Sequence, residues 1–354
     1  MDTHAISAKE RPFARCLLLL CLLSACGRAE AGGADAGFDD VFNRGATLRL
    51  AETPEVINVG IEVAPDPRGG FLVADALEGQ VRSYAADGAL RWHAGRKGAG
   101  PGEFRSVVRA VRLRSGQVLA TDWNDRFTLY DSAGSAPPAT VQTPFKHVED
   151  LEVVDDSTVL VSALLELKTH GPRLHLWNLR RNRVAHSFFA PSRGTPNETA
   201  AHMAGWVKAA LRGDTIAAVF SLADTVHFFT LDGLRLGAEP IPFRHFRPVA
   251  PKMPSGAAVA SPVERARWLA SFDLVNNVSW LPDGRLVFTY QSMVAEQGLT
   301  RRWHLLGMRR GGPALFELRD VPRLMAVDDV RGALYFMTPG SETPNQWTVA
   351  TLRG

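Results

Sequence analysis

The sequence predicts an all-β protein, a six-bladed β-propeller of four-stranded antiparallel blades with short helical insertions before the fourth and fifth blades. Three observations predict this fold. A strongly β-forming segment recurs six times, a turn signal precedes five of the six copies, and a polar turn and further strands follow. The recurring segments are 70–75, 117–122, 158–163, 215–220, 285–290 and 333–338. A β-sandwich, or a pair of sandwiches, is the alternative.

Glycine and aspartate mark the turns before these segments. The turn pairs are Arg68-Gly69, Ser115-Gly116, Gly213-Asp214, Asp283-Gly284 and Arg331-Gly332, and the third copy has Asp155-Asp156-Ser157 instead. Such residues tolerate a positive φ or form local side-chain turns, so each is typical of a hairpin. Repeats of this kind stack to bury one continuous core, which favours a ring over separate sheets.

A glycine-rich loop, Gly98-Ala99-Gly100-Pro101-Gly102-Glu103-Phe104, follows the first predicted blade. Together with its flanking strands, about a fifth of the chain, from Val59 to Tyr130, resembles NHL-type propeller repeats and related bacterial six-bladed propeller lipoproteins. The matching strands are 70–75, 81–84, 117–122 and 126–130. The resemblance implies the fold and transfers no activity, because NHL propellers serve unrelated roles.

The two ends of the predicted ring are expected to meet in one blade. Thr47–Ala51 is β-prone and precedes the first blade, and Trp347–Leu352 ends the last one. Propellers usually close by pairing a strand from one terminus into the blade formed by the other. We therefore expect Thr47–Ala51 to be the outer strand of the last blade.

Two segments have the form of a capping box with proline at the first helical position: Thr195-Pro196-Asn197-Glu198 and Ser261-Pro262-Val263-Glu264. The hydroxyl can accept from the N3 amide, the glutamate can reach back, and the missing proline N–H costs nothing there. The sequence therefore predicts short helices near 196–203 and 262–271, both on the same face of the ring.

The N-terminus has the parts of an export signal. A basic start is followed by an apolar run, 16–23, which is too short for a bilayer span of about 20 residues. Leu23-Ser24-Ala25-Cys26 resembles the lipobox of bacterial lipoproteins, which implies cleavage before Cys26 and lipid on its thiol. An ordinary secretory signal ending near a cysteine is the alternative. The predicted domains are a signal peptide, 1–25, a lipidated cysteine with a flexible tether, 26–46, and the propeller, 47–354.

Cysteine content and charge narrow the class of protein. The three cysteines lie at or before position 26, so the mature chain can form no internal disulfide. The full chain's formal net charge of +3 gives no electrostatic case for a nucleic-acid partner. We expect the protein in the cell envelope, anchored to the bilayer through Cys26. Gly27 is not the aspartate that marks inner-membrane retention in enteric bacteria, which favours the periplasmic face of an outer membrane.

Candidate ligand-binding residues lie near the starts of the predicted inner strands, where side chains face the mouth of a central channel. They are Asn58, Arg109, Glu149, Asp150, Lys208, Asn276, Asn277 and Arg323. Mixed charge from several blades suits a polar ligand better than an apolar one. The alternative for each residue is a solvated or internally paired side chain without a ligand.

The sequence favours a non-catalytic binding module for an envelope protein, peptide or glycan, without a cofactor. It contains no H-E-x-x-H or G-x-S-x-G element and no cysteine nucleophile after the lipobox. The alternative is a metal-dependent hydrolase that resembles the propeller lactonases. In that case Ca²⁺ or another divalent ion would be held by Glu149 or Asp150 together with Asn276 or Asn277. Arg109 and Lys208 would repel such an ion.

Overall fold

The computed structural model describes residues 36–58, 61–165, 171–191, 206–248, 262–295, 299–341 and 344–353. The chain divides into two compact units, 1–34 and 35–354, and every described residue belongs to the second. The predicted signal peptide, Cys26 and the predicted helix at 196–203 therefore lie outside the described residues.

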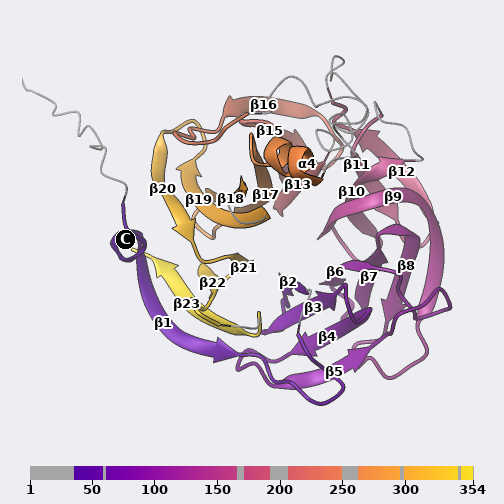
Figure 1. Cartoon of the computed structure of the whole chain (residues 1–354). Helices are drawn as coiled ribbons and strands as arrows, with labels where there is room; N and C mark the ends of the chain where they lie inside the picture. Colours follow the sequence, from indigo (N-terminus) through magenta and orange to yellow (C-terminus); the bar gives the residue numbers. More distant parts are fainter. Residues whose placement is uncertain are drawn as a thin grey trace, which may run out of the picture. The chain divides into compact units, whose positions relative to one another are not determined.

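The described strands form four four-stranded sheets and one seven-stranded sheet, arranged as a ring (Figure 1). Three of the four-stranded sheets follow chain order and are antiparallel throughout. The first contains β2 (Ile61–Pro65), β3 (Phe71–Asp75), β4 (Gln80–Tyr84) and β5 (Leu90–Ala94). The second contains β13 (Val207–Arg212), β14 (Thr215–Phe220), β15 (Thr225–Thr230) and β16 (Arg235–Pro240). The third contains β17 (Asp273–Trp280), β18 (Arg285–Ala295), β19 (Leu299–Arg309) and β20 (Ala314–Val321).

The seven-stranded sheet contains one strand that belongs to two ladders. Its strands are β6 (Val107–Arg112), β7 (Val118–Asp122), β8 (Asn124–Tyr130), β9 (Ala139–Val153), β10 (Thr158–Leu165), β11 (Leu174–Asn178) and β12 (Arg183–Phe188). Strand β9 pairs with β8 from Ala139 to Lys146 and with β10 from Phe145 to Val153. The first half of β9 thus continues one meander, and its second half begins the next.

The fourth four-stranded sheet joins the two ends of the second unit. Its order is β1-β23-β22-β21, with β1 (Phe42–Arg49), β23 (Gln346–Leu352), β22 (Ala333–Met337) and β21 (Leu324–Asp328). Thr47 lies opposite Thr348 and Leu48 opposite Trp347 in an antiparallel ladder. This pairing confirms that the segment beginning at Thr47 is the outer strand of the last sheet.

Strand β1 begins earlier than the sequence predicted. The short helix α1 (Phe38–Val41) precedes it, so part of the segment assigned to a flexible tether, 26–46, is folded. The reason is aromatic packing: the rings of Phe38 and Phe42 lie with centroids 4.9 and 5.5 Å from that of Phe336. The glycine, alanine and aspartate around these two phenylalanines obscured this signal.

Hydrophobic clusters join each meander to the next all the way around the described ring. One cluster joins β3 and β4 to β6 and β7, and another joins β6–β8 to β9–β11. Others lie between β10–β11 and β13–β15, between β13–β15 and β17–β19, and between β18–β20 and the sheet of β1. The last packs the sheet of β1 against β2–β4, which closes the ring.

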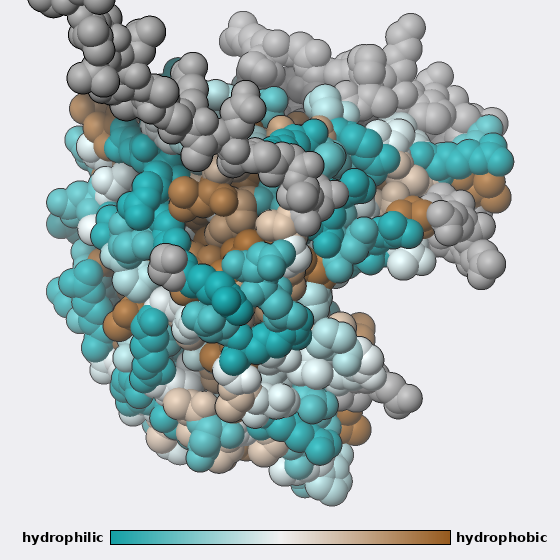
Figure 2. Space-filling model, turned by 90° about the vertical axis from the view of Figure 1, so that its left-hand side faces the viewer, coloured by the Kyte–Doolittle hydropathy of each residue, from teal (hydrophilic) through white to brown (hydrophobic). Residues whose placement is uncertain are grey.

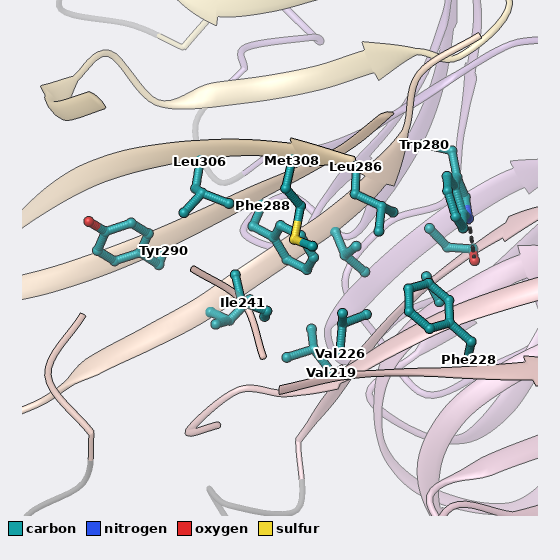
Figure 3. Packing of buried hydrophobic residues seen from close by; sticks show 14 residues of the cluster. Val219, Val226, Phe228, Ile241, Trp280, Leu286, Phe288, Tyr290, Leu306 and Met308 are labelled. Atoms are coloured by element: carbon teal, nitrogen blue, oxygen red, sulfur yellow. Dashed lines mark hydrogen bonds between the residues drawn. The ribbon is translucent and has the colours of Figure 1, made fainter. Parts of the chain in front are cut away.

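Figure 3 shows one of these clusters in detail. Phe228 from β15 and Phe288 from β18 pack within it, beside Leu306 from β19. Trp280 lies at its edge and donates its indole N–H to the backbone oxygen of Ala210, at 3.2 Å. The indole can therefore be buried without leaving its N–H without a hydrogen-bond partner.

Helix α4 (Pro262–Leu269) confirms the predicted insertion before β17, although it ends two residues earlier than the expected range of 262–271. Trp268 is buried and packs against Phe272 and Leu274, with Trp206 alongside. These contacts place the helix near the starts of β13 and β17 (Figure 1). Within the described ranges, no helix has both the length and the apolarity to cross a bilayer.

The surface seen in Figure 2 is mostly hydrophilic, with apolar areas interspersed between larger polar ones. Large apolar side chains that stay exposed include Leu236 on β16, Leu234 just before it, and Leu315 on β20. Scattered exposed apolar residues are normal on soluble domains.

Candidate functional site

A cavity of about 1120 Å³ lies at the centre of the ring and is lined by the first strand of each meander. Residues of β2, β6, the second half of β9, β13, β17 and β21 contribute to its wall. Strands β2, β6, β13, β17 and β21 lie innermost in Figure 1. A volume of this size is at the upper end of small-molecule pockets and can hold an extended side chain or a short peptide segment.

The structure brings together seven of the eight residues predicted from the sequence. The residues that line the cavity are Arg109, Glu149, Asp150, Lys208, Asn276, Asn277 and Arg323. They come from β6, β9, β13, β17 and the residue before β21. These residues converge because the first strand of each meander faces the centre of the ring.

Asn58 is the exception and does not line this cavity. It lies before β2, its side chain is buried, and Arg82 donates to its Oδ1 at 2.7 Å. Its amide donates to the hydroxyl of Tyr84 at 3.3 Å. Arg82 also pairs with Asp75 at 3.0 Å, so Asn58 completes a buried polar network inside the first sheet. The sequence placed Asn58 on the inner strand, which begins three residues later.

Three ion pairs connect neighbouring inner strands around the channel. The ammonium of Lys208 lies 3.7 Å from Glu149 Oε2, and Arg109 Nε lies 3.7 Å from Asp150 Oδ1. Arg323 forms a shorter pair with Glu62, at 2.7 Å. Each pair joins residues of different strands, so the charges also fix how the inner strands sit against one another.

The first two pairs differ from the ion pairs that stabilise the sheets. Charge-assisted hydrogen bonds are typically about 2.7–2.9 Å long, and a separation of 3.7 Å is too long for one. The fully buried pair between Arg112 and Asp66 measures 2.7 Å. In the channel, Lys208 instead donates to the backbone oxygen of Glu149 at 3.0 Å. The carboxylate of Glu149 is thus near a cation without a full hydrogen bond to it.

Buried polar atoms without a hydrogen-bond partner collect in the wall of this cavity. Among the described residues that line the cavity, such atoms include Arg109 Nε, Glu149 Oε1, Asn276 Oδ1 and Gln291 Oε1. Buried polar atoms almost always have a partner, because leaving one without costs about 1–3 kcal/mol. Their concentration here indicates a wall that is prepared for polar contacts with a ligand or with water.

Glu152 was not among the predicted site residues, yet it lines the same channel. Burial inside the ring, together with the charges of Asp150 and Asp329, raises its pKa to about 8 against the opposing charge of Arg109. Alternation along Asp150-Leu151-Glu152 was the signal available in the sequence, since residues i and i+2 share one face of a strand.

Glu149 and Arg109 respond to the same enclosed surroundings. Burial raises the pKa of the Glu149 carboxyl, and Lys208 acts against that change. Burial alone would lower the pKa of Arg109, but the charges of Asp150, Glu152 and Glu62 outweigh it and raise the pKa. The wall therefore combines a firmly charged guanidinium with carboxylates that ionise reluctantly.

Gln291 and Trp303 are further cavity-lining residues that the sequence did not reveal. Gln291 lies on β18, the second strand of its sheet, and is 5% exposed. The guanidinium of Arg323 lies 5.3 Å from the ring centroid of Trp303, a cation–π contact. Both residues escaped detection because only first strands were expected to reach the channel.

Cationic nitrogens lie near the carboxylates named for the divalent-ion alternative. Within the described ranges there is no group of three or more His, Cys, Asp or Glu side chains that could hold a metal ion. The two candidate carboxylates, Glu149 and Asp150, each lie 3.7 Å from a cationic nitrogen. A divalent ion placed there would compete with Lys208 and Arg109, as the sequence predicted.

A closed ring of antiparallel sheets around a polar channel defines the chain as an all-β propeller. No family model matches the sequence, and no curated protein matches it. The resemblance of residues 59–130 to NHL repeats therefore stays a prediction.

Two solved structures are similar to this fold. One is a member of the DUF4221 family from Bacteroides vulgatus, with a TM-score of 0.62 and 9% identity, covering 88% of this chain and 97% of that one. The other, from Bacteroides fragilis, is described as a protein predicted to be exported. Its TM-score is 0.58 and its identity 12%, covering 90% of this chain and 97% of that one. At such identities the likeness shows the fold alone.

Proposed function

We propose that this chain is a six-bladed β-propeller, lipid-anchored through Cys26 in the cell envelope, that binds a protein or peptide at its central channel. The observation that carries the binding function is the group of unpartnered polar atoms in the channel wall, namely Arg109 Nε, Glu149 Oε1, Asn276 Oδ1 and Gln291 Oε1. These atoms are not needed to stabilise the fold, because the sheets contain short ion pairs of their own.

The count of six blades rests on β9. The four four-stranded sheets are four blades, and the seven-stranded sheet supplies two more if β9 ends one blade and begins the next. The two ladders of β9 overlap only at Phe145 and Lys146, which supports this division. A separate hydrophobic cluster between β6–β8 and β9–β11 also supports it.

The lipid anchor rests on the N-terminal sequence. Leu23-Ser24-Ala25-Cys26 has lipobox form, and the chain contains no cysteine after Cys26. One acyl chain gives only marginal membrane binding, so the two or three chains of a mature lipoprotein would be needed for stable attachment. The remaining spacer ends at or before α1, because Phe38 and Phe42 already belong to the folded unit.

Membrane fractionation tests the anchor. The full-length protein is expected in the membrane fraction, and a Cys26→Ser variant is expected to lose the lipid and to remain in its unprocessed form. The measurement is the intact mass of the purified protein, which increases by the diacylglycerol and acyl groups only when the thiol is modified. A mature protein without added lipid mass would contradict the anchor.

Photocrosslinking in intact cells tests the binding site. A photoreactive amino acid at Asn277, in the cavity wall, is expected to capture an envelope protein. The control places the same photoreactive amino acid at position 234, near β16, where Leu234 is 64% exposed. It is expected to give no such product. Equal capture at both positions, or none at Asn277, would contradict a binding site in the channel.

A further inference from the structure

We infer that the channel recognises a cation, the ammonium or guanidinium group of a basic side chain on the bound protein. This inference rests on the proposed function and specifies the chemistry of the same site. Of the four wall atoms named above, Glu149 Oε1, Asn276 Oδ1 and Gln291 Oε1 accept and Arg109 Nε donates. A ligand that completes these contacts must bring hydrogen-bond donors.

Glu149 determines the sign of the charge that the ligand must carry. The amides of Asn276 and Gln291 can turn by 180° and present either a donor or an acceptor. The ionised carboxylate of Glu149 only accepts, and its Oε1 is buried without a partner. Lysine and arginine side chains carry three and five N–H donors and no acceptor, so they match such a wall better than a hydroxyl or an amide does.

The charge balance of the wall points the same way. Three lining pairs neutralise one another at 3.3 Å or less: Asp66 with Arg112, Asp328 with Arg331, and Glu62 with Arg323. The charged lining residues that remain are Glu149, Asp150, Glu152 and Asp329 against Arg109, Lys208 and Arg301. When Glu152 is ionised, four acids face three bases, and a bound monocation would favour that ionised form.

The acids gather on one wall of the channel. Glu149, Asp150 and Glu152 all lie on β9, and burial together with the charge of Asp150 opposes the ionisation of Glu149 and Glu152. A cation between them would relieve that repulsion, whereas an anion would add to it. Gln291, 5% exposed, places an independent buried acceptor in the same cavity from β18.

The aromatic part of the wall is compatible with this ligand. Arg323 already stacks over Trp303, with its guanidinium 5.3 Å from the ring centroid. Trp206 also lines the cavity, where it packs beside Trp268 of α4. Indole faces attract cations, and more strongly where water is excluded.

Peptide titration against the full-length lipoprotein in detergent tests the inference. The probes are capped Gly-Gly-Lys-Gly-Gly, the same peptide with arginine, and an uncharged version in which norleucine replaces lysine. The lysine and arginine peptides are expected to bind at least tenfold more tightly than the norleucine peptide, and more weakly as salt is added. Equal binding of the norleucine peptide would overturn the inference.

Glu149→Gln keeps the size of the side chain and removes its charge. We expect it to reduce binding of the lysine peptide about tenfold or more. The matched control is Glu239→Gln on β16, which removes a carboxylate that also contacts an arginine, Arg310, outside the channel. Melting curves identify a variant that fails to fold, and in that case the comparison of lysine with norleucine on the unchanged protein still decides.

Two further outcomes separate the hypotheses. Binding of free spermidine without binding of the lysine peptide would overturn the assignment to a partner's side chain, although a cation would still be recognised. If the crosslinker at Asn277 captures a protein and the basic peptides do not compete with it, the cation inference fails and the binding function stands. If Asn277 captures nothing, the proposed function itself fails.

Discussion

Leu48 and Trp347 lie opposite each other in the ladder of β1 and β23, although they come from opposite ends of the folded unit. Trp347 is completely buried, and its ring packs edge-on against Phe71 of β3, with centroids 4.9 Å apart. Trp347 thus links β1, which completes its own sheet, to β3 of the neighbouring sheet. The ring depends on this place more than on any one turn.

Removal of the ring-closing strand should destabilise the whole protein. Deletion of residues 45–52 removes the half of β1 that contains Leu48 and exposes the edge of β23. We expect a sharp fall in melting temperature, followed by circular dichroism. Deletion of the equally long segment 27–34, which precedes the second unit, is the control and should leave melting unchanged. Unchanged melting after the first deletion would contradict ring closure by β1.

Loss of the Asp75 carboxylate should be far more costly than loss of an exposed one. The side chains of Asp75 and Arg82 are both fully buried, so Asp75→Ala leaves a guanidinium in the interior without its counter-charge. The expected loss is about 3–5 kcal/mol in the free energy of unfolding. The exposed pair of Asp39 and Arg44 provides the control, and Asp39→Ala should cost far less, because solvent screens an exposed pair. Urea denaturation measures both; similar losses would contradict the burial argument.

Glycine at position 70 is required by space as well as by backbone angle. Its φ is 102°, and a Cβ there would lie 2.1 Å from the backbone oxygen of Tyr84. Gly213 has a φ of 56° with no atom within 4 Å of such a Cβ. Gly213→Ala should therefore cost only the left-handed strain of about 1–2 kcal/mol, and Gly70→Ala should cost clearly more. Equal shifts of the urea midpoint would show that the close approach is relieved cheaply.

The pKa of Glu152 gives the protein a predictable loss of stability with rising pH. The folded value of about 8 exceeds the ordinary value of 4.5, so between these pH values the folded state holds a proton that the unfolded state has released. Stability therefore falls as pH rises through that window. Glu152→Gln cannot ionise, so its advantage over the unchanged protein should grow from pH 5 to pH 8. A pH-independent difference in melting temperature would contradict the shift.

The sequence predicted the blades well because their signals are local. Glycine and aspartate turns, such as Asp283-Gly284, set strand starts through backbone angles that neighbours in space hardly change. Ring closure was predictable from topology, since a propeller needs a partner for its last edge. The double role of β9 was not, because its fifteen residues contain no break such as Asp-Gly. Pairing with two different partners is a property of the assembled sheet.

The candidate site was predictable only to the extent that it follows from strand position. Arg109 and Lys208 stand near the starts of inner strands, and the ring brings them together. Asn58 precedes β2, so a small error in the predicted boundary placed it in the channel, whereas it belongs to a buried network with Arg82. Gln291 reaches the channel from a second strand, which depends on the length and bulge of β18 against β17.

The order of synthesis determines when the ring can close during folding. Strand β1 is synthesised first among the described strands and β23 last, and neither has its complete set of backbone partners until the other is present. A polypeptide that is still emerging can form its inner meanders, but the open edge of the final sheet waits for the C-terminus. Truncation by even one strand at that end would leave two unpaired edges, which are sites of intermolecular association.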